Sequence, residues 1–183
     1  MKVIETNRLI LRRFTGADAA FILELLNEPA WKRYIGDRGI NSLESARHYL
    51  ETVPIASYQR HGFGLYAMQQ KVDTELVGMC GLIKRDGLDD VDIGFAVLSR
   101  FEGQGLATEA AAATLAYSRS TLGLKRLVAI TSIDNERSAR LLERLGMRFE
   151  RMVRLSEDAE QLRLYSIAFA PTEGLAVHRR DEV

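Results

Sequence analysis

Apolar and polar positions divide the chain into strand-like and helix-like segments. Alternation or short β-branched runs predict strands over residues 8–14, 63–70, 75–84, 91–97, 125–132, 147–155 and 161–169. Apolar residues at helical spacing predict helices over residues 21–26, 41–53, 108–118 and 134–146. This order predicts one α/β domain over residues 1–170, a sandwich with a mixed central sheet of about six to seven strands and helices on both faces. Residues 171–183 are predicted to be a polar C-terminal tail.

Local signals place the ends of several helices. Residues 41–44 (NSLE) resemble a capping box, and Pro54 predicts a break or a kink after residue 53. Asp134 or Asn135 is expected to cap the helix that ends before Gly146.

The segment VDIGFAV alternates cleanly and predicts a strand with two unlike faces. The apolar face, expected to point into the core, carries Val91, Ile93, Phe95 and Val97. The opposite face carries Asp92, Gly94 and Ala96. We therefore expect a single carboxylate beside two small residues that leave space.

Composition narrows the class of protein. The 183 residues include 25 Lys and Arg against 25 Asp and Glu, so the zero net charge supplies no overall field that would attract nucleic acid or an anionic membrane. The single cysteine, Cys80, excludes a disulfide within the chain. No apolar run has the length of a signal peptide or a membrane span, and the three histidines are scattered. A cytoplasmic protein without a bound metal is the expectation.

Two glycines in RFEGQGLATEA stand where a helix should begin. A glycine-rich turn between a strand and a helix leaves backbone N–H groups free to bind phosphate, and Arg100 and Thr108 add a charge and a hydroxyl. The segment lacks the Lys-Ser/Thr of a P-loop and, with Thr108 in place of a third glycine, the dinucleotide fingerprint. By themselves, Gly103 and Gly105 fit either a phosphate site or a plain strand–helix connection.

Four segments in order carry a resemblance to a known family. They are TNRLILR (6–12), DIGFAVLSRFEGQGLATEA (92–110), DNERSARLLERLGMRFE (134–150) and LYSIAF (164–169). Together they resemble the GNAT superfamily of N-acetyltransferases, and more narrowly the branch of the bacterial ribosomal-protein-alanine N-acetyltransferases. The resemblance spans residues 6–169 and implies acetyl-coenzyme A as the cosubstrate.

The resemblance also assigns a role to individual positions. It implies that the amides of Gln104, Gly105, Leu106 and Ala107 hold the pyrophosphate, helped by Thr108, Gly103 and Arg100. Phe95, Ala96 and Val97 would pair with the pantetheine arm through their backbone. Asn135 and Ser138, three residues apart on one helix face, would point at the pantetheine and the thiol.

The implied reaction is direct attack of an amine on the thioester. Asp92 is the candidate base or amine-orienting carboxylate, although many relatives carry a glutamate there. The tyrosine that many members use as an acid is replaced by Leu142, which leaves Ser138 as the nearest substitute and Tyr165 as a distant one. A thiol with a pKa near about 8.5 leaves without much help, so activity does not require that tyrosine.

The acceptor side is less determined by the sequence. Trp31 and Tyr34 either line the acceptor site or pack as ordinary hydrophobic side chains, and Asp92 could instead be a solvated strand residue. Cys80, in an apolar strand without a nearby histidine, is interpreted as a buried inert thiol. The expected acceptor is a protein N-terminus, of a ribosomal protein or another, or a small amine. An open sheet edge would allow a homodimer, and a non-catalytic acyl-coenzyme A-binding module is the alternative function.

Overall fold

The computed structural model describes residues 1–170, and the predicted tail 171–183 lies outside the described residues. The strands are β1 (Lys2–Glu5), β2 (Leu9–Arg12), β3 (Leu65–Gln70), β4 (Leu76–Ile83), β5 (Asp92–Val97), β6 (Arg126–Ser132), β7 (Arg148–Val153) and β8 (Leu162–Ala168). The α-helices are α1 (Ala19–Asn27), α2 (Pro29–Tyr34), α3 (Leu43–Leu50), α4 (Ala56–His61), α5 (Leu106–Ser120) and α6 (Glu136–Arg144). Short η1 (Gly16–Asp18) and η3 (Ser99–Phe101) are 3-10 turns, and η2 (Glu51–Ile55) is a π-helical segment.

The strands form one mixed sheet in the order β1-β2-β3-β4-β5-β6-β8-β7. Antiparallel pairing runs from β1 to β5 and again through β6, β8 and β7, whereas β5 and β6 are parallel. The α/β class and the mixed sheet are as the sequence predicts. The sheet has eight strands rather than six to seven.

Three elements escape the sequence pattern. β1 and α2 are four and six residues long, too short to show a period. Of the break or kink expected at Pro54, the break does not occur, since the helical run continues through η2 into α4. Because a π-helical turn relaxes the backbone where proline cannot donate, the chain passes Pro54 without ending the helical run.

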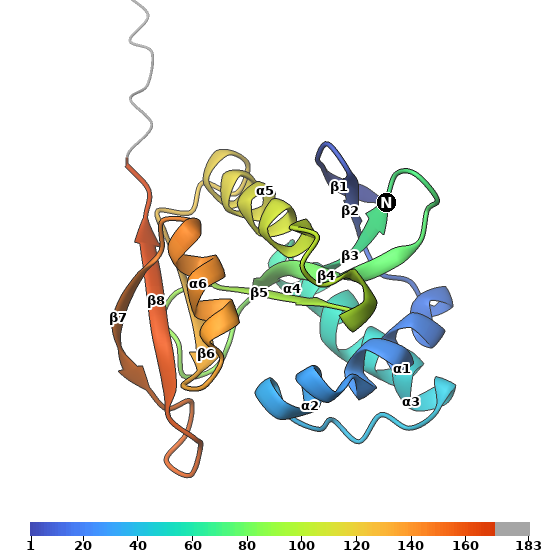
Figure 1. The fold of residues 1–183 in the computed structure, drawn as a ribbon, viewed down its shortest axis with the longest axis horizontal. Helices are drawn as coiled ribbons and strands as arrows, with labels where there is room; N and C mark the ends of the chain where they lie inside the picture. Colours follow the sequence, from blue (N-terminus) through green and yellow to red (C-terminus); the bar gives the residue numbers. More distant parts are fainter. Residues whose placement is uncertain (171–183) are drawn as a thin grey trace, which may run out of the picture.

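Helices cover both faces of the sheet (Figure 1). One core packs α5 and α6 against strand residues that include Leu9, Cys80 and Leu127. A second core packs α1, α2 and α3 against the other face, with Trp31 and Met79 among its buried members. No helix among residues 1–170 is long and apolar enough to cross a membrane.

The sheet divides between β5 and β6. Their ladder contains one register pair, Asp92 with Val128, beside the backbone bond from Val128 N to Val91 O of 3.0 Å. Beyond this point the two strands separate, and Figure 1 shows α5 and α6 on either side of the division. β5 is fully paired with β4 on its other edge, so only its β6 edge is left open.

Candidate functional site

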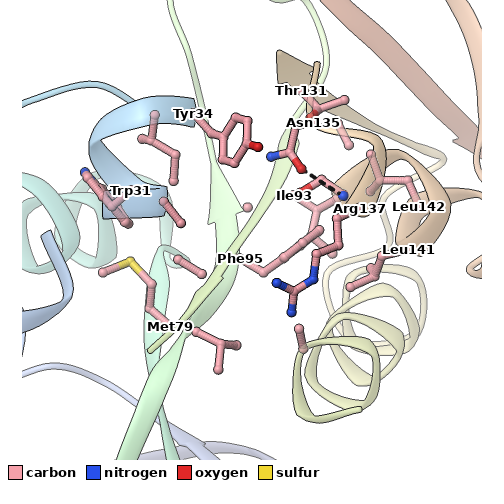
Figure 2. A pocket seen from close by; sticks show the side chains of 18 of the residues that line it. Trp31, Tyr34, Met79, Ile93, Phe95, Thr131, Asn135, Arg137, Leu141 and Leu142 are labelled. Carbon is pink, nitrogen blue, oxygen red and sulfur yellow. Dashed lines mark hydrogen bonds between the residues drawn. The ribbon is translucent and has the colours of Figure 1, made fainter. Parts of the chain in front are cut away.

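A pocket of about 830 Å³ occupies the division between β5 and β6. This volume is within the usual range for a small-molecule site. The sequence-predicted residues that line it are Trp31, Tyr34, Asp92, Phe95, Ala96, Val97, Gly103, Gly105, Leu106, Ala107, Thr108, Asn135 and Ser138. Figure 2 shows Trp31 and Tyr34 on one side, Asn135 and Arg137 on the other, and Phe95 between them.

The N-terminus of α5 opens into the pocket, and no side chain caps it. Gly105 is its N-cap residue with φ +77°, and Gly103 has φ +75°, conformations that favour glycine. The first helical bond runs from Glu109 N to Gly105 O, at 3.0 Å. Among the described residues, none accepts a hydrogen bond from the amides of residues 103–108. Free N–H groups at the positive end of a helix dipole form an anion site.

The open edge of β5 offers backbone groups to the pocket. Antiparallel pairing alternates along a strand, and Leu98 N donates to Val77 O of β4 at 2.9 Å. The backbone groups of Phe95 and Val97 therefore point away from β4, toward β6. Those of Ala96 point at β4, so a ligand lying as an added strand along residues 95–97 would bond to the backbone of Phe95 and Val97, while Ala96 only lines the pocket.

The first turn of α6 forms the facing wall. Its N-cap is Asn135, whose Oδ1 accepts a hydrogen bond from Ser138 N at 3.0 Å (Figure 2). The hydroxyl of Ser138 has no hydrogen-bond partner among the described residues. Leu142 is 1% exposed and belongs to the core, so it adds only an apolar surface to the pocket.

Asp92 is a buried carboxylate at the point where the sheet divides. Its side chain is 1% exposed, and Oδ2 lies 2.5 Å from Arg85 Nε. Oδ1 accepts a weak bond from Ile130 N at 3.3 Å, where the next rung of the β5–β6 ladder would have formed. Burial raises the pKa of Asp92 to about 6, although Arg85 and the Ile130 amide act in the opposite direction. A carboxyl group with this pKa is mostly ionised at neutral pH. Because the Asp92 side chain is buried, the alternative of a solvated strand residue is wrong.

The space expected beside Asp92 is partly filled. A Cβ on Gly94 would meet Ile83 Cδ1 at 3.0 Å and Leu65 Cδ2 at 3.6 Å. Ala96 packs against the second hydrophobic core. Both faces of β5 are thus covered, because helices lie on each side of the sheet.

Sequence reasoning missed the partner of Asp92. Arg85 follows β4, and the hairpin register pairs Ile83 with Asp92. Arg85 lies one residue beyond the predicted strand 75–84, so the β4–β5 register is needed to bring it to the carboxylate.

A second missed pair joins the two walls of the pocket. Arg33, at the end of α2, lies 2.8 Å from Asp134, just before α6. Both side chains are exposed, so the pair adds little stability, but it places Tyr34 and Asn135 at the same mouth. Trp31 is 6% exposed and packs in the second core, so it both lines the pocket and serves the core.

Several candidate residues lie away from the pocket lining. Arg100 pairs with Glu24 and, at 3.0 Å, with Glu75. The Gln104 carbonyl accepts a bond from Arg8, and Tyr165 is buried in the core. The structure therefore does not bring Arg100 or Tyr165 to the site.

Cys80 is fully buried, as the sequence suggests. It lies 3.5 Å from Thr114 Oγ1, and burial raises the pKa of its thiol to about 12. A group of three or more potential metal ligands does not occur within residues 1–170.

Comparison with known proteins agrees with this geometry. A family model described as the acetyltransferase (GNAT) domain matches residues 8–148, more than half of the chain. The chain is 29% identical over 153 residues to YoaA of Bacillus subtilis, described as an uncharacterized N-acetyltransferase, with 83% of this chain and 86% of that protein covered.

Two solved structures show the same fold. An acetyltransferase from Agrobacterium tumefaciens has a TM-score of 0.78 at 25% identity, covering 92% of this chain and 95% of that one. RimL, described as a ribosomal L7/L12 alpha-N-protein acetyltransferase in complex with coenzyme A, has a TM-score of 0.78 at 19% identity, covering 92% and 98%. At that identity the second likeness concerns the fold alone.

Proposed function

The chain belongs to the GNAT acetyltransferase family and is an acetyl-transferring enzyme, and from this premise we propose that it acetylates a primary amine by direct attack on acetyl-coenzyme A. The acceptor is the α-amine of a protein N-terminus or a small amine. The observation that carries the proposal is the pocket between β5 and β6, which joins an anion site to a buried carboxylate.

Acetyl-coenzyme A fits this pocket by its chemistry. The uncapped start of α5 suits the pyrophosphate, with the amides of Gly105, Leu106 and Ala107 as donors and Thr108 beside them. The outward backbone groups of Phe95 and Val97 suit the amides of the pantetheine arm, which would lie as an added strand. The thioester would then reach the level of Asn135 and Ser138.

The acceptor amine must lose protons as the new bond forms. At pH 7 about 0.04% of an ordinary lysine amine is neutral, against roughly 10–15% of an α-amine. An α-amine therefore needs less help from a base. Asp92 is our candidate to orient the amine or to take its proton, and Arg85 favours the charged form of its carboxylate against the effect of burial.

The chemistry is balanced without an acyl-enzyme. The amine nitrogen bonds to the acetyl carbon, the carbon–sulfur bond breaks, and the proton lost by the amine compensates the one gained by the departing thiolate. Burial of Cys80 supports direct attack, because the only thiol in the chain does not line the pocket. In this proposal an outward-facing backbone amide of β5 also stabilises the tetrahedral oxyanion.

The mouth of the pocket supports an extended or small acceptor. Trp31 and Tyr34 line it from α2, opposite Asp134 and Asn135. RimL acts on a protein α-amine by its description, and its fold is shared here. A protein N-terminus, ribosomal or other, is therefore the first acceptor class to test.

The test is a thiol-release assay with acetyl-coenzyme A and a panel of acceptors. The panel contains peptides with a free N-terminus and acetylated lysines, the same peptides with a blocked N-terminus and free lysines, and small amines. We expect thiol release with at least one free α-amine or small amine, and a mass gain of one acetyl group on that acceptor. Tight coenzyme binding without release on any member would contradict the proposal for those classes.

A further inference from the structure

Arg8, in the turn between β1 and β2, forms hydrogen bonds to the start of α5 from outside the pocket. Its Nη1 donates to the Gln104 carbonyl at 2.9 Å, and its Nε donates to Glu109 Oε2 at 2.6 Å. The amide of Arg8 donates to Glu109 Oε1 at 2.8 Å, and the Thr6 hydroxyl adds a bond of 2.7 Å to the same oxygen. One residue therefore holds both the glycine loop and the first turn of the helix.

The bond to Gln104 orients a peptide group. The C=O of Gln104 and the N–H of Gly105 belong to one planar trans peptide and point in opposite directions. Neither Arg8 nor Gln104 lines the pocket, whereas Gly105 does. Holding the carbonyl on the outer side therefore keeps the Gly105 N–H directed at the pocket and keeps a carbonyl dipole away from a bound anion.

The bond to Glu109 reduces the repulsion between this carboxylate and an anion bound at the start of α5. A carboxylate in the first turn suits the helix dipole but repels an anion bound at the same terminus. Burial opposes ionisation, yet the bonds from Thr6 and Arg8 hold the pKa of Glu109 below its usual value, so it is charged. The Arg8 guanidinium compensates this charge within a hydrogen bond.

We propose that Arg8 is a positioning residue for the pyrophosphate of the coenzyme, acting through Gln104 and Glu109. The proposal rests on the proposed function of the pocket. Its effect is confined to donors that carry phosphate, because Arg8 shapes the anion site and not the acceptor end.

The experiment compares two acetyl donors. Acetyl-coenzyme A carries the pyrophosphate, and S-acetylpantetheine has the same thioester and arm without it. For Arg8→Ala we expect the KM for acetyl-coenzyme A to rise about tenfold with kcat retained, while kcat/KM for S-acetylpantetheine stays within about twofold. Arg8→Lys should be intermediate, because lysine can pair with Glu109 but lacks the planar fork that also reaches Gln104.

A matched control tests whether loss of any arginine charge near α5 has the same effect as loss of Arg8. Arg119 is an exposed arginine at the far end of α5, and Arg119→Ala should leave both donors unaffected. Equal losses of Arg8→Ala with the two donors, or no loss with either, would overturn the proposal. Calorimetric titration of wild type and Arg8→Ala with coenzyme A tests the inference even if no acceptor reacts. Failure of the wild type to bind coenzyme A would instead contradict the proposed function.

Discussion

One end of the pocket is formed by backbone groups and the other by charged side chains. At the start of α5, backbone amides and glycines form the site, and none of residues 103–108 has a charged side chain. At the other end, the carboxylate of Asp92 is paired with Arg85, and the exposed pair of Arg33 with Asp134 lies at the mouth. A backbone site suits a donor shared by a whole family, whereas a side-chain site can change with the acceptor.

This contrast predicts that variants at the two ends affect different constants. Changes at the α5 end should alter coenzyme affinity, and changes at the Asp92 end should alter turnover. A variant that changes coenzyme affinity and turnover equally would contradict this separation of the two ends.

The largest effect is expected for Asp92→Asn. Loss of the carboxylate should lower kcat about a hundredfold, because a positioned base contributes about that factor or more, and should leave the Kd for coenzyme A within about twofold. Steady-state kinetics and calorimetry measure the two constants. Asp90→Asn, two residues before Asp92 and paired with Arg126 at 2.8 Å, is the control expected to retain activity. An unchanged kcat in Asp92→Asn would leave Asp92 with a structural role only.

The next effect is expected at the other end. Gly103→Val should raise the Kd for coenzyme A about thirtyfold, since Gly103 lines the pocket and its φ of +75° disfavours a branched side chain. Gly123→Val is a matched control, because Gly123 also has positive φ (+65°) and open space but does not line the pocket. Both variants should lose similar stability in thermal unfolding. Equal Kd values for the two would contradict an anion site at the glycine loop.

A pH profile sharpens the account of the Asp92 end. If ionised Asp92 is required, kcat/KM expressed per neutral acceptor amine should fall as the pH drops through about 6. Arg85 lowers the pKa of Asp92, so Arg85→Gln should move this acidic limb about one unit toward higher pH. Arg60→Gln, an exposed change on α4, should leave the profile in place. A limb that stays fixed in Arg85→Gln would assign the titration to another group.

The smallest effect is expected for Ser138→Ala. The Asn135 side chain still caps α6 after this change, because it accepts from the backbone N–H of residue 138, so only the free hydroxyl at the pocket is lost. We expect kcat to fall about threefold with unchanged stability, as for one neutral hydrogen bond. Ser120→Ala, whose hydroxyl binds only the α5 backbone, is the control. A loss above about a hundredfold would instead make Ser138 the essential acid.

The sequence predicts the backbone end better than the side-chain end. The period of residues 91–97 and the two glycines indicate a strand, a turn and an open helix start, all of which are local. The direction of the Ala96 backbone needs the β4 register, which is not local. Likewise, Arg100 reads as a phosphate ligand beside the glycines, but Glu24 and Glu75 from distant segments hold it elsewhere.

Burial and pairing account for the remaining differences. Asp92 alternates with apolar residues, a pattern that also fits a solvated side chain. In the fold it is buried, and Arg85 and the Ile130 amide supply its hydrogen-bond partners. The short α2 has no period of its own, although it contributes Trp31 and Tyr34 to the pocket.

The central claim is that free amides at the start of α5 hold the coenzyme. The most direct measurement is a titration of ¹⁵N-labelled protein with coenzyme A, followed by amide chemical shifts. We predict large shifts for the amides of residues 103–108 together with Phe95 and Val97. We predict none for Ser45 at the start of α3, where the Ser42 side chain already occupies the amide. Saturable binding that leaves residues 103–108 unshifted would contradict the account.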